Sequence, residues 1–334
     1  MKRLASEPRQ GWKQKIEEQG LVFSSTTMDD GRRIEYWNES AYYEFTMDEV
    51  ETLELAAEEM HRMCLEAAKF LATGAMGSIG IGPQALELAA ESLQAGDVDV
   101  YGRFDFIYDG QGGPAKMLEY NADTPTGLIE AAVAQWFWLQ DVHPEKDQWN
   151  GIHEALIRQW KKFQYRTGMS TLHVAHSEVE ESGEDWMTAA YMRDVASQAG
   201  WTTIGINMSD IGWDPNLLPA YLTDPGPLKE WVAKPLHGRE GDNIRIHAEG
   251  LTLEQPGGYG REGWCYQQYH PLPDFDGNRP VLGLWVVDGE SVGCGIRESD
   301  GPVTDYFCRF VPNTIDAPAP LSAVAGSTKA GIIL

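Results

Sequence analysis

The sequence predicts an α/β (α+β) protein in which mixed and antiparallel sheets are flanked by helices. Three observations support this class: an amphipathic helix after Thr46, a strand–helix–strand unit between residues 172 and 208, and a second half made mostly of strands and loops. The chain has 334 residues, of which 42% are apolar and 10% aromatic, enough for a substantial core in one large domain or in two closely packed ones.

The first long helix is predicted to begin at Thr46, which forms a capping box with Glu49, and to end at Gly74. Apolar residues then recur at alternating steps of three and four, which is the pattern of a stripe that packs against a core. These positions are Val50, Leu53, Ala57, Met60, Cys64, Ala67 and Leu71. We therefore expect a buried stripe along this helix rather than a cofactor-binding surface.

A β-hairpin is predicted over residues 97–122. The stretch "DVDVYGRFDFIYDG" alternates strongly, a Gly-rich turn follows it, and "KMLEYN" forms the second strand. Because strand side chains repeat every two residues, Arg103 and Asp105 share one face of the first strand, and Glu119 and Asn121 share one face of the second. All four side chains converge if the register of the hairpin permits.

A second helix is predicted to start where this hairpin ends. Thr124 followed by Pro125 is typical of an N-cap with proline at the first helical position, and it opens an apolar segment through Trp138. The oxygen-bearing side chains of Glu119 and Asn121 then stand beside a helix N-terminus. Such a place can hold a cation and an anion together.

The remaining elements complete the predicted scaffold. Residues 150–165 have the pattern of an amphipathic helix, and "LHVAHS", a helix at about 185–199, and "TTIGINM" form a β-α-β unit. No Gly-rich turn joins its first strand to its helix, which argues against a dinucleotide site.

Composition limits the partners of the protein. A formal charge of −25 argues against binding to a nucleic-acid backbone and is compatible with cationic ligands. An acidic composition is also a common way for a protein to stay soluble.

The four cysteines form no CxxC pair, so neither a zinc site nor a disulfide framework is indicated. Residues 1–20 lack the apolar core of a signal peptide, and no apolar run approaches the roughly 18 residues of a membrane span. We therefore expect a cytoplasmic protein without a membrane partner.

Asp105, Glu119 and Asn121 form the first candidate site. Hard oxygen donors of this kind suit magnesium, which takes few protein ligands and completes its shell with water and substrate phosphates. A solvated acidic hairpin is the alternative interpretation of the same spacing.

Two further motifs carry positive charge. In "AKPLHGREG", Lys234 ends a strand, and Gly238 and Gly241 allow a loop whose backbone NH groups could approach phosphate oxygens, although a plain hairpin loop fits as well. In "GIRESDG", Arg297 follows an apolar strand and could stabilise a phosphoryl group, or it could form a surface ion pair. Together with the acidic site, these motifs supply the parts of magnesium–nucleotide chemistry.

Four longer motifs extend this interpretation: "LEYNADTPTGLIEAA", "KPLHGREGDNIRI", "QQYHPLPDFDGN" and "GIRESDGPVTDYFCRFVP". In sequence and in order they resemble the synthetase domain of the glutathionylspermidine synthase family, from about Trp37 to Pro312. The resemblance implies an ATP-grasp fold, with ATP and magnesium used to form a carbon–nitrogen bond through an acyl phosphate.

The resemblance also implies roles for individual residues. It matches Asp105, Glu119 and Asn121 to the metal ligands, Arg103 to an arginine that stabilises the transition state, and Arg297 to a second arginine near the phosphates. It matches three residues to nucleotide binding: Lys234, Gln267 and Gln268. It implies four positions for the substrate: Glu240 and Gly241 in a loop, and Thr124 and Thr126 at the helix start.

Two departures from the family pattern lead to further expectations. The amidase domain of the bifunctional enzymes is missing, so we expect no hydrolytic half-activity, and we assign residues 1–315 to the synthetase domain and 316–334 to a peripheral tail. The sequence also joins directly near Pro215 and Asn216, where the family carries several dozen more residues, including another nucleotide-binding lysine; either the chain is shortened here or the sequence lacks a segment that the protein has. The leading hypothesis is a ligase that joins a peptide-like carboxylate to an amine or polyamine. The alternative is a degenerate ATP-binding module that does not ligate.

Overall fold

The structure, a computed structural model, describes residues 1–27, 31–75, 77, 82–122, 125–176, 183–207, 224–236, 238–261 and 263–318. The shortened region near Pro215 and Asn216 lies outside these residues, as does the predicted tail from residue 319 onward. Residues 316–318 form the end of a strand.

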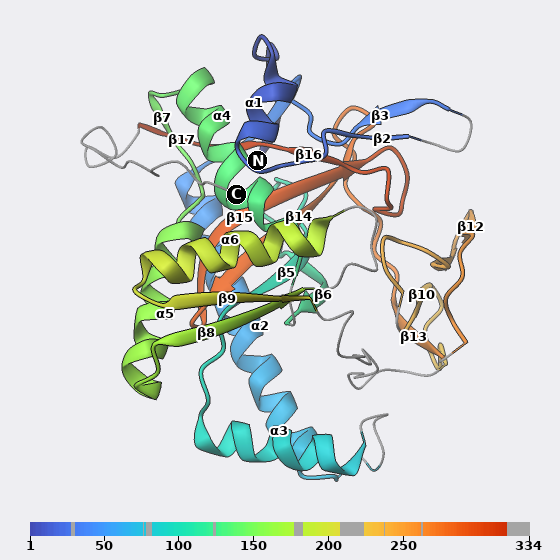
Figure 1. The fold of residues 1–334 in the computed structure, drawn as a ribbon. Coiled ribbons are helices and arrows are strands. Elements are labelled where there is room, and N and C mark those ends of the chain that lie inside the picture. The colour runs from blue at the N-terminus through green and yellow to red at the C-terminus, as the bar shows by residue number, and fades with distance from the viewer. Residues whose placement is uncertain are drawn as a thin grey trace.

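An antiparallel five-stranded sheet forms the centre of the molecule (Figure 1). Its strand order is β16-β15-β14-β5-β6, so the predicted hairpin of β5 and β6 lies at one edge. The strands are β5 (Gly102–Ile107), β6 (Lys116–Asn121), β14 (Arg279–Val287), β15 (Glu290–Ser299) and β16 (Arg309–Val311).

Alternation along the strands divides their side chains between two apolar cores. Phe104 and Phe106 of β5 point to the core that includes the first half of helix α2 (Met47–Ala72). Trp285 and Val287 of β14 point to the other core, which holds the helices of the opposite face. These are the π-helix η1 (Glu130–Ala134), α4 (Gln135–Val142) and α5 (Ile152–Thr167). Arg103 and Asp105 alternate with Phe104 and Phe106, so they lie on the face of η1.

Smaller sheets surround this centre. A mixed sheet has the order β1-β4-β17-β7, with β17 parallel to β4, and β8 and β9 form a parallel pair around α6 as the sequence predicts. The bounds are β1 Lys2–Ala5, β4 Ala41–Phe45, β17 Asn313–Pro318, β7 Lys146–Asp147, β8 Thr171–His176, α6 Glu184–Gln198, β9 Thr202–Asn207, α1 Trp12–Glu18, β2 Ser25–Thr27 and β3 Arg33–Glu35. The predicted α/β class with mixed and antiparallel sheets flanked by helices is confirmed.

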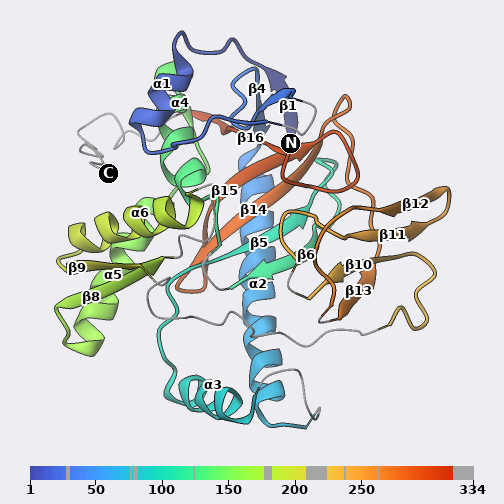
Figure 2. The same cartoon turned by 45° about the vertical axis from the view of Figure 1, so that its right-hand side comes forward.

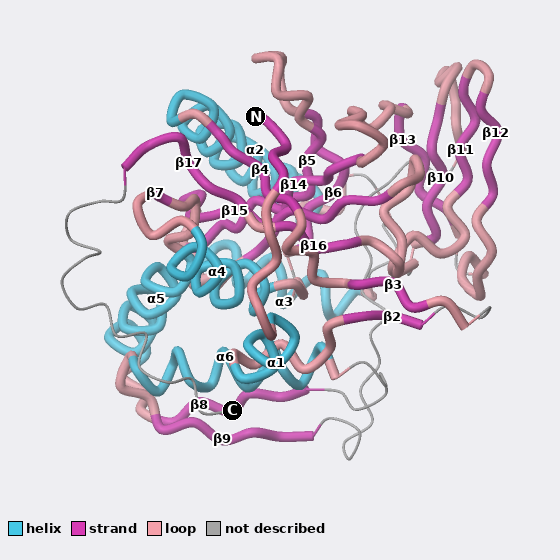
Figure 3. Tube along the Cα trace, turned by 90° about the horizontal axis from the view of Figure 1, so that it is seen from above, coloured by secondary structure: helices cyan, strands magenta, loops and turns pink. Residues whose placement is uncertain are grey.

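A separate four-stranded sheet stands beside the centre (Figures 2 and 3). Its strand order is β12-β11-β10-β13, and all its pairings are antiparallel. The strands are β10 (Trp231–Pro235), β11 (Arg245–Ala248), β12 (Leu251–Glu254) and β13 (Trp264–Gln268). This sheet carries Lys234, Gln267 and Gln268.

The predicted start of helix α2 is confirmed, and the predicted stripe is fully buried only in the first half of the helix. The capping box of Thr46 and Glu49 is present, and Val50, Leu53 and Ala57 are buried. Met60 and Cys64 are partly buried and pack against the same core, and Ala67 is exposed, so the predicted stripe is covered as far as Cys64 and the expectation of burial is wrong at Ala67. Met63, Leu65 and Phe70, which lie off the stripe, are exposed large apolar residues. The outer half extends past the sheet toward α3 (Pro83–Ala95), which has no buried residue (Figure 2). Periodicity identifies the stripe but not what covers it.

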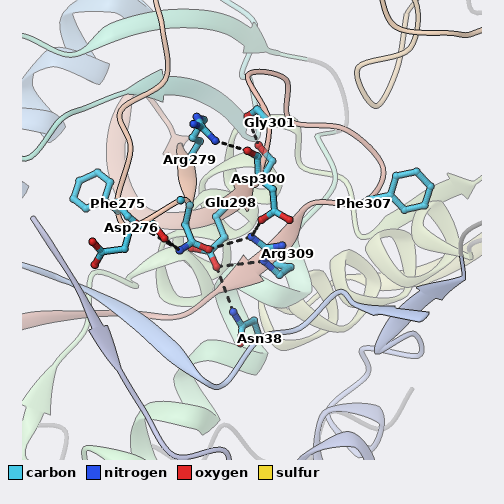
Figure 4. A network of polar contacts seen from close by, with 12 residues as sticks. Asn38, Phe275, Asp276, Arg279, Glu298, Asp300, Gly301, Phe307 and Arg309 are labelled. Atoms are coloured by element: carbon cyan, nitrogen blue, oxygen red, sulfur yellow. Dashed lines mark hydrogen bonds and ion pairs between the residues drawn. The ribbon is translucent and has the colours of Figure 1, made fainter. Parts of the chain in front are cut away.

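Glu298 ties the central sheet to the N-terminal strands. Its side chain is fully buried and accepts hydrogen bonds from Nε and Nη2 of Arg3 at 2.9 Å each and from the hydroxyl of Tyr43 at 3.0 Å. Asn38 and Arg309 donate to the same carboxylate (Figure 4).

Replacing Glu298 with Gln should destabilise the protein by about 3 kcal/mol, because Arg3 and Arg309 lose a buried counter-charge. Urea denaturation measures the free energy of unfolding. Glu290→Gln, at an exposed position of the same strand, is the matched control and should leave that free energy unchanged. Equal stabilities for both variants would show that the Glu298 network does not hold the sheet.

Candidate functional site

A buried ion pair on β5 forms the base of the site. Arg103 donates from Nε to Oδ1 of Asp105 at 2.7 Å and from Nη2 to Oδ2 at 3.2 Å. Burial alone would raise the pKa of Asp105, but the charges of Arg103 and Arg297 outweigh it and lower this pKa to about 2. Asp105 is therefore a fixed negative charge at neutral pH.

Arg297 reaches the same carboxylate from β15. Its Nη2 lies 2.5 Å from Oδ2 of Asp105, although β14 runs between their two strands. Burial acts to lower the pKa of Arg297, but Asp105 raises it above its ordinary value. One carboxylate thus holds two arginines.

Two glycines make this convergence possible. Gly283 and Gly295 are register partners on β14 and β15. A Cβ atom on Gly283 would lie 2.9 Å from Cδ of Arg103, and one on Gly295 would lie 2.8 Å from the ring of Phe310. A larger residue at Gly283 would therefore force the Arg103 side chain to shift.

The register of the hairpin brings the predicted oxygen donors together. Asp105 pairs with Glu119 and Arg103 pairs with Asn121, so the four side chains share one face. Nδ2 of Asn121 donates to Oε1 of Glu119 at 3.1 Å, and the Glu119 side chain is 46% exposed. The predicted convergence of these four residues is confirmed.

The donor set of Asp105, Glu119 and Asn121 suits magnesium by its chemistry. It offers two carboxylates and one amide oxygen on a single face, and magnesium requires few protein ligands. Within the described parts of the chain, no cluster of three or more His, Cys, Asp or Glu side chains is arranged to hold a metal. Water and phosphate oxygens would therefore have to complete the shell of a magnesium ion here.

The start of the next helix lies against the arginines. Nη1 of Arg103 donates to the carbonyl of Thr126, and Gly127 adopts a φ of 81° beside it. A cavity of about 10 Å³ lies between this turn and the sheet, lined by Arg103, Thr126, Gly127, Gly283, Trp285, Gly295, Arg297 and Phe310. Thr124, the predicted N-cap, lies outside the described residues. Pro125 is not helical and the helix begins at Leu128, after the positive-φ Gly127, so the predicted start with proline at the first helical position is wrong.

Sequence reasoning missed Glu130, a buried acid near both arginines. It begins the π-helix η1, and the hydroxyl of Tyr36 donates to its Oε1 at 2.7 Å. Burial raises its pKa, while the hydrogen bond from Tyr36 and the charges of Arg103 and Arg297 act in the opposite direction. The available signal was a lone acid inside the apolar run "GLIEAAVAQWFWL".

The four-stranded sheet brings two of its three predicted residues to the hairpin. Nζ of Lys234 lies 3.4 Å from Oε2 of Glu119 and donates to the carbonyl of Leu118 at 3.3 Å. Nε2 of Gln267 donates to the same carbonyl at 3.2 Å. Gln268 alternates with Gln267 and lines a hollow of about 770 Å³ near His247 instead. The three residues therefore do not meet at one point.

The loop of Glu240 and Gly241 packs on a different segment of the site. Both residues have positive φ, and a Cβ atom on Gly241 would lie 2.8 Å from Cγ1 of Val303. Burial raises the pKa of Cys308 to about 11, with Arg297 opposing the rise and Glu240 contributing to it. The loop therefore lies within electrostatic reach of the segment around Cys308, which adjoins Arg297.

Comparisons with known proteins agree with this arrangement. A family model described as "Glutathionylspermidine synthase preATP-grasp" matches residues 3–215 and 213–316. A Haemophilus influenzae protein provisionally named an acid–amine ligase is 32% identical over 395 aligned positions, which cover 94% of this chain and 99% of that protein. That aligned length exceeds the 334 residues of this chain, so the relative carries residues without a counterpart here.

Two further similarities are more limited. Trypanothione synthetase of Crithidia fasciculata is 31% identical over 308 residues, covering 63% of this chain and 46% of that protein. The apo structure of a glutathione synthetase-like effector from Globodera pallida aligns with 93% of this chain and 98% of its own, with a TM-score of 0.43 and 9% identity. No described helix is both long and apolar enough to cross a membrane. The family model accounts for most of the sequence, and the chain belongs to the glutathionylspermidine synthase preATP-grasp family.

Proposed function

We propose that this protein is an ATP-dependent carbon–nitrogen ligase that joins a carboxylate to an amine through an acyl phosphate. The observation that carries the proposal is the convergence of Arg103 and Arg297 on Asp105, beside a helix start and the hairpin residues Glu119 and Asn121. The names of two relatives, an acid–amine ligase and a trypanothione synthetase, support the same reaction class.

The proposed reaction has two steps. A carboxylate oxygen attacks the γ-phosphorus of ATP, the bond to the β-phosphate oxygen breaks, and ADP leaves. The nitrogen of the amine then attacks the acyl carbon, phosphate leaves, and the nitrogen loses a proton to give the amide. Both steps leave negative charge on a departing phosphate group, the β-phosphate of ADP in the first and inorganic phosphate in the second, so a fixed positive environment lowers the barrier.

Arg103 and Arg297 supply that environment. Asp105 fixes both guanidinium groups in place, so they need no rearrangement when charge develops on the transferred group. Thr126 and the positive-φ Gly127 directly precede the first turn of the helix, whose NH groups would face an anion in the proposal. The proposal keeps Thr124 and Thr126 as substrate residues. Asp105, Glu119 and Asn121 would hold magnesium, which would neutralise part of the phosphate charge.

The four-stranded sheet provides the other nucleotide contacts of the proposal. Lys234 and Gln267 face β6, where a phosphate chain would lie between the two sheets, and Gln268 acts from the hollow on the opposite face. Glu240 and Gly241 form the loop for a peptide-like carboxylate. The charge of −25 favours a cationic amine, such as a polyamine, as the second substrate of a cytoplasmic enzyme.

A degenerate ATP-binding module is the second candidate. It is favoured by the residues that the Haemophilus influenzae relative carries and this chain lacks. Such a module would bind nucleotide without transferring a phosphoryl group.

ADP release that depends on added amine separates the two candidates. We expect release with ATP, magnesium, a peptide carboxylate and a polyamine, and mass spectrometry of a panel of peptides and amines should detect the amide product. Omitting either the carboxylate or the amine is the control. Nucleotide binding without amine-dependent ADP across the panel would favour the binding module.

Arg103→Ala should lower single-turnover ADP formation by about a hundredfold, or on the order of 3 kcal/mol, with a much smaller change in ATP affinity. Arg103→Lys should recover little, since an ammonium cannot reproduce the two-pronged contact with Asp105. Rates are measured at saturating ATP beside melting curves, and Arg62→Ala, on an exposed part of α2, is the control. Near-normal rates in Arg103→Ala would remove Arg103 from the chemistry.

A further inference from the structure

The outer half of helix α2 carries an apolar seam that the described part of the chain leaves open to solvent. Met63 and Phe70 are 50% and 54% exposed, and Ala67 between them is exposed as well. Their spacing of four and then three residues places them along one side of the helix, and Met60, which is partly buried, precedes them on the same line. An exposed stripe with this heptad spacing is typical of a helix that pairs with another helix.

The described neighbours of α2 pack on other sides of this helix. Its outer half extends past the central sheet, and α3 contacts it near its end (Figure 2). Ala68 and Ala72, which are partly buried, lie on the side of α2 opposite Phe70. Leu65 is another exposed apolar residue, at 39%, but it lies about 140° or more around the helix from Met63 and Phe70. The seam is therefore a separate open surface.

The charges beside the seam occur in pairs of opposite sign. Arg62 donates to Glu59 at 2.5 Å, and Lys69 donates to Glu66 at 2.8 Å. Residues 59–72 contain these two acids and two bases and no other Asp, Glu, Lys or Arg, so the segment is formally neutral in a chain of charge −25. Two copies of such an acidic chain repel each other least where these neutral segments meet.

We propose that the seam is covered by a second copy of this chain, with the outer halves of the two α2 helices paired in an antiparallel arrangement. A two-fold interface has to be complementary to itself. With the two-fold axis level with residue 65, Met63 of each copy faces Ala67 of the other, so a large side chain meets a small one twice. In a parallel pair, each Met63 would face the other Met63, and each Ala67 would face the other Ala67, which packs less evenly.

The antiparallel arrangement also brings together four charges at the axis. Glu66 of each copy lies next to the axis, and Arg62 of the other copy lies beside it, so the two carboxylates stand between two guanidinium groups. In a parallel pair, Glu66 would instead face Leu71 of the second copy and gain no opposite charge from it. Charge complementarity therefore favours the antiparallel pairing.

The length of the seam sets the expected strength of the dimer. Residues 60–70 span only about 15 Å of helix. An interface of this size lies at the low end for specific association, so we expect a reversible dimer. Sedimentation velocity on the full chain should detect mostly monomer at about 1 μM and mostly dimer at about 100 μM.

Met63→Glu and Phe70→Glu should each weaken the dimer at least roughly tenfold, because each places a charge inside the seam. Leu65→Glu is the matched control, since Leu65 is an exposed apolar residue of the same helix but lies off the seam, and it should leave the dimer unchanged. Melting curves of the three variants should agree with one another, because all three positions are on the surface.

Arg62→Glu and Glu66→Arg test the antiparallel register. Either variant alone places four like charges at the axis and should remain a monomer at about 100 μM. An equimolar mixture of the two restores the alternation of charges and should dimerise at least as strongly as the wild type. The variants also lose ion pairs within the helix, but that loss is present in the mixture too and cannot restore pairing.

Each outcome decides for or against the pairing, and none depends on the proposed ligase activity. A wild type that stays monomeric at about 100 μM overturns the proposal and leaves the seam to a helix of another protein. A dimer that Met63→Glu and Phe70→Glu do not weaken uses a different surface and also overturns it. A mixture of Arg62→Glu and Glu66→Arg that stays monomeric excludes the antiparallel pairing, whereas a dimer restored only in the mixture supports it.

Discussion

The buried carboxylate of Asp105 is the constraint on which the rest of the site depends. A charge inside a sheet requires charged partners, and Arg103 and Arg297 supply them from two strands that are not neighbours. The arrangement favours glycine at position 283, because a Cβ atom there would lie 2.9 Å from Cδ of Arg103. The first turn of the next helix is fixed in turn, since the carbonyl of Thr126 accepts from Arg103.

The alternation of side chains along β5 determines the positions of both the apolar core and the site. Phe104 and Phe106 bury one face of β5 against α2, so Arg103 and Asp105 must occupy the opposite face. A register slip of one residue would exchange the two sets and move the charges into the core. Packing of aromatic rings on one side therefore secures the position of ionic groups on the other.

The α/β class, the hairpin, the capping box and the β-α-β unit could be predicted because each rests on local periodicity or on a cap. The cluster of Arg103, Asp105 and Glu119 could be predicted for the same reason, whereas the roles given to Lys234 and Gln267 came from family resemblance. Long-range facts were beyond local patterns: the parallel pairing of β17 with β4, the exposed outer half of α2, and the burial of Glu130 all depend on which elements meet.

Strand β6 is the last strand of the five-stranded sheet, and a free edge is a template for pairing with another chain. The carbonyl of Leu118 on this strand instead accepts hydrogen bonds from Lys234 and Gln267. The neighbouring sheet thus occupies this edge carbonyl with side chains rather than with another backbone. The two side chains proposed for nucleotide binding thereby leave one fewer unpaired backbone group on this edge.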